Sequence, residues 1–135
     1  MEKYLIIVDL DETLLSDERT ISDCSKKVLR TCQELGHKVV ISTARSYIRT
    51  VEYAKALNAD FISSFSGNFI CDSNDSVIYD QAIESETSKK VINEIARQNG
   101  RIINEGLYAS FCSDSRDQEF VDSNYAAINF LTNWI

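Results

Sequence analysis

Two carboxylates separated by one residue follow a short apolar run near the start of the chain. The run is Tyr4–Val8, and Asp9, Leu10 and Asp11 come directly after it. A carboxylate that attacks phosphorus must project into a pocket from the end of a strand, beside a cation that offsets the charge of the phosphate. A second acid must protonate the leaving oxygen. The spacing therefore predicts Asp9 as the nucleophile and Asp11 as the general acid, which later serves as the general base.

The same two residues are the predicted ligands of Mg²⁺. The carboxylate of Asp9 and the backbone carbonyl of Asp11 could bind the ion, with waters completing an octahedron. Two carboxylates this close repel each other, which should raise one pKa and help Asp11 to hold a proton. Thr13 is expected to brace the loop by hydrogen bonding. An acidic turn without chemistry is the alternative for Asp-x-Asp alone, but the whole string from Asp9 to Leu15 is much more specific.

Strands and helices are expected to alternate in the first half of the chain. In order, the pattern predicts a strand at 4–8, a helix capped by Thr20 or Ser22 and ended by Gly36, a strand at 37–42, a helix at 45–57 and a strand at 61–64. This alternation is typical of the α/β class, with a Rossmann-like, doubly wound parallel sheet and right-handed crossovers. In such sheets the ligand site lies beyond the carboxyl ends of the strands, where Asp9 and Thr43 fall.

The pattern changes after Ser66. The second half predicts a hairpin of strands at 68–72 and 77–80, a helix at 87–99, two strands at 101–104 and 107–112, and a last helix at 126–135.

The composition excludes several classes of protein. The net charge of −7 argues against a nucleic-acid surface, which needs a basic face. The longest early apolar run is too short for a membrane span or a signal segment. The four cysteines form no C-x-x-C pair, and the one histidine, His37, has no clustered partner. These features favour reduced thiols in a cytoplasmic protein.

A second motif strengthens the first and carries a family resemblance. The segment Val39–Arg45 is an apolar strand that ends in Thr43-Ala44-Arg45. Together with the Asp9 loop, it resembles the haloacid-dehalogenase-like (HAD) superfamily, whose strand ends in Thr-Gly-Arg. The resemblance implies that Thr43 hydrogen-bonds a phosphoryl oxygen and that Arg45 lies at the rim of the pocket. Ala44 replaces the usual Gly.

A third segment resembles the Cof-type branch of sugar-phosphate phosphatases. Phe65–Ile70 is similar to the Asn-Gly-Ala segment of that branch, with Ser66 in place of the usual Asn. The phosphate-binding residues expected from the resemblance are Leu10, Thr43, Arg45 and Asn68. The implied domains are residues 1–83, the N-terminal part of a HAD-like core with its hairpin, and residues 84–135, the start of an α/β cap.

Two parts of the family pattern lack a clear match. One is a Lys that neutralises charge at the nucleophile, and the other is an acidic motif that completes the Mg²⁺ site. A compact alternative assigns Lys89 or Lys90 and the segment Ser113–Asp117 to these roles. The preferred hypothesis is a chain that stops inside the cap, which would leave Tyr4–Val8 as an apolar edge. We therefore expect a homo-oligomer or a complementing C-terminal chain.

The resulting functional hypothesis is a Mg²⁺-dependent phosphatase that acts on a small phosphorylated metabolite through an aspartyl-phosphate. The alternative is a truncated, non-catalytic HAD-like chain that binds Mg²⁺ or phosphate, or that needs a complementing chain. A receiver-type signalling domain is a third class. It is disfavoured because Leu10 separates the acids and because Asp60 precedes the third strand instead of ending it.

Overall fold

The computed structural model describes residues 2–108 and 110–113, and it divides the chain into two compact units. The first is Met1–Gln81 and the second is Ala82–Ile135. Each unit is described by itself. None of the helices in the described part of the chain is long and apolar enough to cross a membrane.

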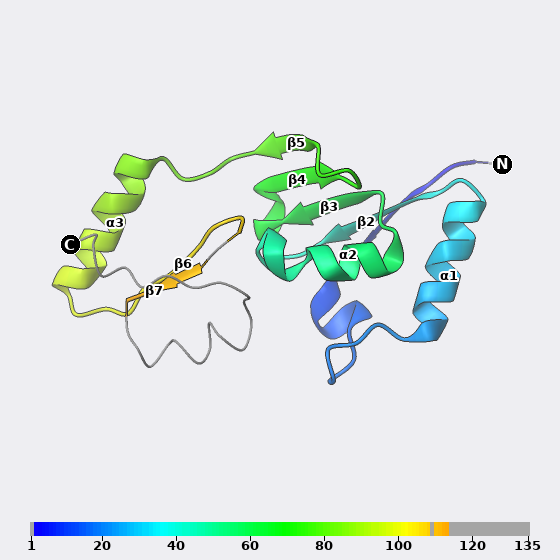
Figure 1. Cartoon of the computed structure of the whole chain (residues 1–135), viewed down its shortest axis with the longest axis horizontal. Helices are drawn as coiled ribbons and strands as arrows, with labels where there is room; N and C mark the ends of the chain where they lie inside the picture. Colours follow the sequence, from blue (N-terminus) through cyan, green and yellow to red (C-terminus); the bar gives the residue numbers. More distant parts are fainter. Residues whose placement is uncertain (1, 109, 114–135) are drawn as a thin grey trace. The chain divides into compact units, whose positions relative to one another are not determined.

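The first unit is built on one mixed sheet of five strands in the order β1-β2-β3-β4-β5 (Figure 1). The strands are β1 (Leu5–Val8), β2 (Lys38–Ser42), β3 (Phe61–Ser64), β4 (Phe69–Asp72) and β5 (Val77–Asp80). The first three are parallel, and β4 and β5 continue the sheet as an antiparallel hairpin. The predicted α/β class and the predicted strands are therefore confirmed.

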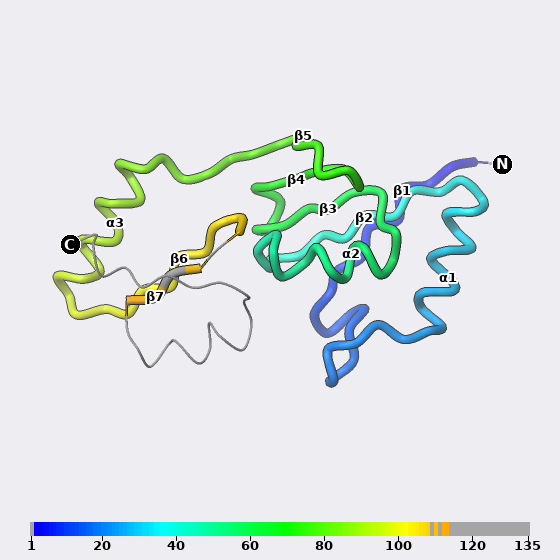
Figure 2. The backbone as a smooth tube through the Cα atoms, in the orientation of Figure 1, coloured from blue at the N-terminus to red at the C-terminus, as the bar shows by residue number. Residues whose placement is uncertain are grey.

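Two helices connect the parallel strands. Helix α1 (Asp23–Glu34) is capped by Ser22, whose hydroxyl accepts the N–H of Ser25 at 3.0 Å. Helix α2 (Val51–Leu57) leads into β3, and the two helices contact each other. Both crossovers step in the same direction across the sheet, so right-handed connections place both helices on one face. Figure 2 lets the reader follow this β-α-β-α-β path along the backbone.

The prediction of one continuous helix at 45–57 is wrong. A 3-10 turn, Tyr47–Arg49, precedes α2, and Ser46 before it is extended. The Thr50 hydroxyl donates to the carbonyl of Ser46 at 2.9 Å. Such local Ser and Thr bonds compete with helical geometry, which accounts for the break.

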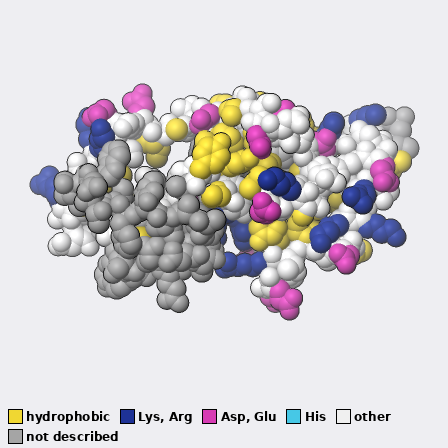
Figure 3. Space-filling view, viewed as in Figure 1, with side chains coloured by type: hydrophobic (Ala, Val, Ile, Leu, Met, Phe, Trp, Pro, Cys, Tyr) yellow, Lys and Arg dark blue, Asp and Glu magenta, His cyan; other side chains and the backbone are white. Residues whose placement is uncertain are grey.

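The core lies between the sheet and its helices. Side chains at alternate strand positions point to the helix side, and there they are buried: Val39, Ile41, Ile62 and Cys71 are at most 3% exposed. Leu29 of α1 and Ala54 and Leu57 of α2 cover them. Hydrophobic side chains also reach the surface among charged ones on the face seen in Figure 3.

Strand β1 forms an edge of the sheet. Among the described residues only β2 pairs with it, and Leu5 and Ile7 are 58% and 61% exposed. The predicted apolar edge is confirmed. The continuous apolar run indicated a strand whose side chains are buried on both faces of the sheet. In the described structure the side chains of β1 are not buried in this way, because β1 has a neighbouring strand on one side only.

The described part of the second unit holds a helix and a hairpin. Helix α3 spans Ser85–Arg97, and the antiparallel strands are β6 (Ile103–Glu105) and β7 (Ser110–Cys112). These elements match the predicted helix and strands, with shifts of a few residues at their ends. The helix predicted at 126–135 lies outside the described residues.

Candidate active site

The predicted site residues of the first unit lie beyond the carboxyl ends of its parallel strands. Asp9 follows β1, Thr43 follows β2, and the turn Phe65–Gly67 follows β3. The strand register pairs Val8 with Ile41 and Ser42 with Ser63, so these three chain segments leave the sheet side by side. This is the edge at which parallel α/β sheets place their ligands.

The loop after β1 is anchored by an apolar residue between the two acids. Leu10 is fully buried, whereas Asp9 and Asp11 are exposed. A hydrogen bond of 2.9 Å from the Leu15 N–H to the Leu10 carbonyl closes the loop. The burial of Leu10 thus leaves both carboxylates at the surface. Thr13 is exposed, and the brace predicted for it stays a prediction.

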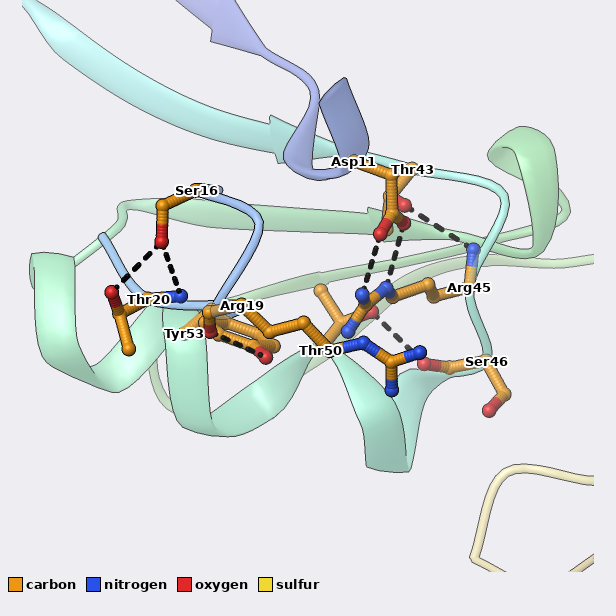
Figure 4. Close-up of polar contacts among 9 residues, drawn as sticks. All are labelled: Asp11, Ser16, Arg19, Thr20, Thr43, Arg45, Ser46, Thr50 and Tyr53. Atoms are coloured by element: carbon orange, nitrogen blue, oxygen red, sulfur yellow. Dashed lines mark hydrogen bonds and ion pairs between the residues drawn. The ribbon is translucent and has the colours of Figure 1, made fainter. Parts of the chain in front are cut away.

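Asp11 forms a two-point ion pair with Arg45. The Nε and Nη2 atoms of Arg45 donate to the two carboxylate oxygens at 2.7 and 2.5 Å (Figure 4). The Arg45 side chain is 9% exposed and that of Asp11 is 54% exposed. Such planar, bidentate pairs fix geometry as well as adding energy. The pair joins the loop that follows β1 to the loop that follows β2.

The ion pair reverses one expectation. The hydrogen bonds from Arg45 hold the pKa of Asp11 below its ordinary value, against a smaller effect of burial. The charges of Arg45, Arg49 and Arg19 act in the same direction. The prediction of a raised pKa from the neighbouring carboxylate is therefore wrong for this arrangement, because the hydrogen bonds and the charge of Arg45 lower the pKa of Asp11 and Asp9 is not among the causes of the shift.

Thr43 lies buried at the end of β2, with 5% of its surface exposed. Its hydroxyl accepts the N–H of Arg45 at 3.3 Å, and its own N–H donates to the carbonyl of Ser63 at 2.9 Å. Thr43 does not cap α2, because Thr50 occupies the N-cap position of that helix. Thr43 instead shapes the loop that presents Arg45.

The turn after β3 is strained and tied to the same loop. Phe65, Ser66 and Gly67 have φ of 51°, 56° and 93° in succession. The N–H groups of Phe65 and Ser66 donate to the carbonyls of Arg45 and Thr43 at 2.8 and 3.1 Å. Left-handed backbone suits Gly or Asn better than other residues, which explains why the similar family segment carries Asn where this chain has Ser66. The strain is held in place by the bonds to the β2 loop.

Asn68 completes this turn. Its side-chain amide donates to the carbonyl of Phe65 at 3.0 Å, and the residue is exposed. Asn68 lies near the carboxyl end of β3, where the site is predicted, but the described contact of its side chain is with its own turn. Its role in binding phosphate stays a prediction.

Sequence reasoning missed the residues that surround Arg45. The centroid of the Tyr53 ring lies 5.3 Å from the guanidinium carbon of Arg45, and the Tyr53 hydroxyl donates to the carbonyl of Arg19 at 3.2 Å. Nothing in the spacing of Tyr53 within α2 distinguishes it from a helix residue that packs on the core. Only the folded arrangement brings it to the site.

Two carboxylates are available to a cation here. No group of three or more His, Cys, Asp or Glu side chains that could hold a metal occurs among the described residues. Asp9 and Asp11 still fit Mg²⁺, because this ion is commonly held by one or two protein carboxylates, waters and the phosphate of a substrate. The carboxylate of Asp11 is turned onto Arg45, so the backbone carbonyl is its more accessible ligand. Asp114 and Asp117 lie outside the described residues.

Two curated phosphatases are similar in sequence to about half of this chain. The 5-amino-6-(5-phospho-D-ribitylamino)uracil phosphatase YcsE of Bacillus subtilis is 42% identical over 71 residues, which are 52% of this chain and 28% of that protein. The phosphatase YitU of the same organism, named for the same substrate, is 38% identical over 68 residues, 50% of this chain and 25% of that protein.

Solved structures superpose over nearly the whole chain. A haloacid dehalogenase-like hydrolase from Bacteroides thetaiotaomicron gives a TM-score of 0.82 at 24% identity, covering 98% of this chain and 53% of its own. A HAD subclass IIB sugar phosphatase gives 0.75 at 22% identity, covering 96% and 52%. The chain thus spans about half the length of these solved relatives and less than a third of the two curated ones.

The family assignment rests on the extent of the match as well as on the motifs. Residues 6–133 match the family of haloacid dehalogenase-like hydrolases, and this range includes the Asp9 loop, Thr43 and Arg45. The chain belongs to the haloacid dehalogenase-like hydrolases.

Proposed function

We propose that this chain carries the nucleophile half of a Mg²⁺-dependent phosphatase that acts on a small phosphorylated metabolite. One observation carries the proposal. The exposed Asp9 at the end of β1 lies in the same short loop as Asp11, which is paired with Arg45 from the end of β2. The phosphatase names of the curated relatives support the same class of substrate.

In the proposed reaction, a carboxylate oxygen of Asp9 attacks phosphorus and the ester oxygen leaves. Asp11 gives that oxygen a proton, and an aspartyl-phosphate remains on Asp9. Asp11 then takes a proton from a water molecule as the water attacks phosphorus, which releases phosphate and restores Asp9. A bound Mg²⁺ ion would offset the charge of the phosphate. Thr43, Arg45, the Leu10 backbone and Asn68 are the proposed phosphate-binding groups.

The ion pair between Asp11 and Arg45 must open before Asp11 can donate its proton. A carboxylate held by a guanidinium is a poor proton donor, since the pKa of Asp11 is lowered. Asp11 must therefore exchange its contact with Arg45 for one with the substrate before it can donate. Arg45 is then available to the phosphate, which its planar donors suit.

Hydrolysis of p-nitrophenyl phosphate with and without Mg²⁺ tests the proposal. Asp9→Asn should lower kcat on the order of 10³-fold or more, because it removes the nucleophile. Asp17→Asn is the matched control, since Asp17 is an exposed acid of the adjacent turn. Equal rates in the wild type and Asp9→Asn would refute catalysis through Asp9.

A second candidate is a chain that completes its site only with a partner. The exposed apolar edge of β1 favours it, since Leu5 and Ile7 are more than half exposed. The partner would be a second copy or a complementing C-terminal chain, and residues 84–135 would act as part of a substrate-selecting cap. We also propose a cytoplasmic location, since the four cysteines favour reduced thiols.

Light scattering after size exclusion tests the partner. The wild type should self-associate as its concentration rises, and Ile7→Lys on β1 should abolish this. Ile78→Lys is the matched control, because Ile78 is 58% exposed on β5, at the opposite edge of the sheet. A wild type that stays monomeric at high concentration excludes self-association through β1.

A further inference from the structure

Arg45 is held by two kinds of group. Asp11 binds its guanidinium at two points, and the guanidinium carbon lies over the ring of Tyr53, 5.3 Å from the ring centroid (Figure 4). A guanidinium within about 6 Å of an aromatic ring centroid is attracted to the face of the ring. With 9% of its side chain exposed, Arg45 has little water to compete with this contact. Its position therefore depends on the ring as well as on the carboxylate.

Tyr53 is itself fixed from two directions. Its backbone lies in α2, and its hydroxyl donates to the carbonyl of Arg19 at 3.2 Å. Arg19 lies in a compact turn with φ of 57°, closed by the N–H of Ser16 on the carbonyl of Thr20 at 2.9 Å. Tyr53 thus links α2, this turn and Arg45. A ring held at its backbone and at its hydroxyl makes a rigid support for a long side chain.

We infer that Tyr53 is a positioning residue, which fixes Arg45 at the end of β2, both in its pair with Asp11 and in its proposed contact with the phosphate. The catalytic consequence rests on the proposed function. An arginine side chain has four rotatable bonds, and a catalytic group held in one geometry avoids the cost of finding it in each turnover. Tyr53 acts chiefly through its ring. Its hydroxyl aims the ring and also interacts with Arg45, which helps to raise the pKa of that guanidinium. It touches neither Asp9 nor the expected place of the phosphate in any described contact.

The test compares three substitutions at one position. Tyr53→Phe and Tyr53→Trp keep a ring, while Tyr53→Leu removes it. Tyr79→Leu is the matched control, because Tyr79 is 46% exposed on β5 and its hydroxyl bonds only Gln81 among the described contacts. If Tyr53→Leu does not fold, Tyr53→Met is the second variant without a ring.

The first readout is the Nε–H of Arg45 in an NMR spectrum, assigned by its absence in Arg45→Lys. In Tyr53→Leu its exchange with water should become roughly 3- to 10-fold faster. Tyr53→Phe, which loses only the hydroxyl, should increase the exchange rate less than Tyr53→Leu does, and Tyr79→Leu should stay within about 2-fold of the wild type. The second readout is turnover of p-nitrophenyl phosphate. Here Tyr53→Leu should lower kcat roughly 3- to 10-fold with KM changed less than about 2-fold, and Tyr53→Trp should restore it.

The two readouts separate the inference from the proposed function. If the wild type shows no turnover, the proposed function fails and the NMR comparison alone decides the role of Tyr53. Unchanged exchange at Arg45 in Tyr53→Leu overturns the inference. A decrease of kcat in Tyr53→Phe as large as that in Tyr53→Leu also overturns the inference, because the ring would then not support Arg45.

Discussion

β1 and β2 have similar sequences and different surroundings. Both are short apolar runs rich in Ile and Val, and they pair in register along their length. Val40 of β2 is 8% exposed, whereas Ile7 of β1, its partner in the strand register, is 61% exposed. The difference comes from neighbours, since β2 has a strand on each side and β1 has one among the described residues. An apolar run therefore predicts a strand, but the topology decides how much of it is buried.

The comparison matters because each strand delivers part of the candidate site. β1 ends in Asp9 and its loop, and β2 ends in Thr43 and Arg45. The carboxyl ends of the two strands are tied together by the ion pair between Asp11 and Arg45. The outer side of β1 has no comparable support in the described structure. The proposed nucleophile, Asp9, thus follows the strand that has fewer neighbours in the described structure.

The largest effect should come from truncating the fully buried isoleucine of β2, compared with the exposed isoleucine of β1. Ile41→Ala on β2 should destabilise the fold by about 2–4 kcal/mol, because it leaves a cavity in the core. Ile7→Ala on β1 should cost less than about 1 kcal/mol, because the side chain is 61% exposed. Urea unfolding followed by circular dichroism measures both. Equal losses would mean that the outer face of β1 is covered in solution.

A smaller loss of stability should come from removing the carboxylate that binds the first residues of β2. Asp60 accepts the N–H of Val39 at 2.9 Å and the ammonium of Lys38 at 2.6 Å. Burial raises the pKa of Asp60, but Lys38, Val39 and Gln33 together hold it below the ordinary value. Asp60→Asn should cost about 1–2 kcal/mol at pH 7.

The pH dependence of this cost follows from the direction of the shift. A carboxylate whose pKa is lower in the folded state stabilises the fold above its unfolded pKa of about 3.9, and the contribution is lost as the pH falls through the folded pKa. The difference between wild type and Asp60→Asn should therefore shrink below about pH 4. A difference that stays constant from pH 7 to pH 3 would show that Asp60 acts through shape and not through charge.

The smallest effect should come from the turn that supports the end of β2. Ser66 has φ of 56°, and Asn accepts such a backbone more readily than Ser. Ser66→Asn should stabilise the fold by a few tenths to about 1 kcal/mol. Ser76→Asn is the control, as it lies in the β4–β5 turn and is not among the residues with positive φ. Thermal unfolding should show a higher Tm for Ser66→Asn alone.

Much of the architecture could be predicted from the sequence because its signals are local. The apolar runs, the Ser22 cap and the hairpin turn each depend on a few adjacent residues. The break before α2 could not be predicted, because the bond from Thr50 to Ser46 competes with a helical pattern that is otherwise good. Asp9 and Thr43 were found because strand ends are visible in the sequence.

The lowered pKa of Asp11 could not be predicted in the same way. It depends on Arg45, which is 34 positions away in the chain, and on the side-chain geometry that brings the two together. The support from Tyr53 is hidden for the same reason. The sequence shows that Asp9 is near Asp11 in the chain, but it does not show that the cation of Arg45 faces Asp11 in the fold.

The central claim is that Asp9, at the end of an edge strand, is a phosphoryl-accepting nucleophile. Beryllofluoride tests this directly, because it forms a mimic of an acyl phosphate on such a carboxylate and needs no turnover. With Mg²⁺ present, ¹⁹F NMR should show protein-bound resonances in the wild type and in Asp17→Asn, and none in Asp9→Asn. Their absence from the folded wild type, or their persistence in Asp9→Asn, would contradict the account.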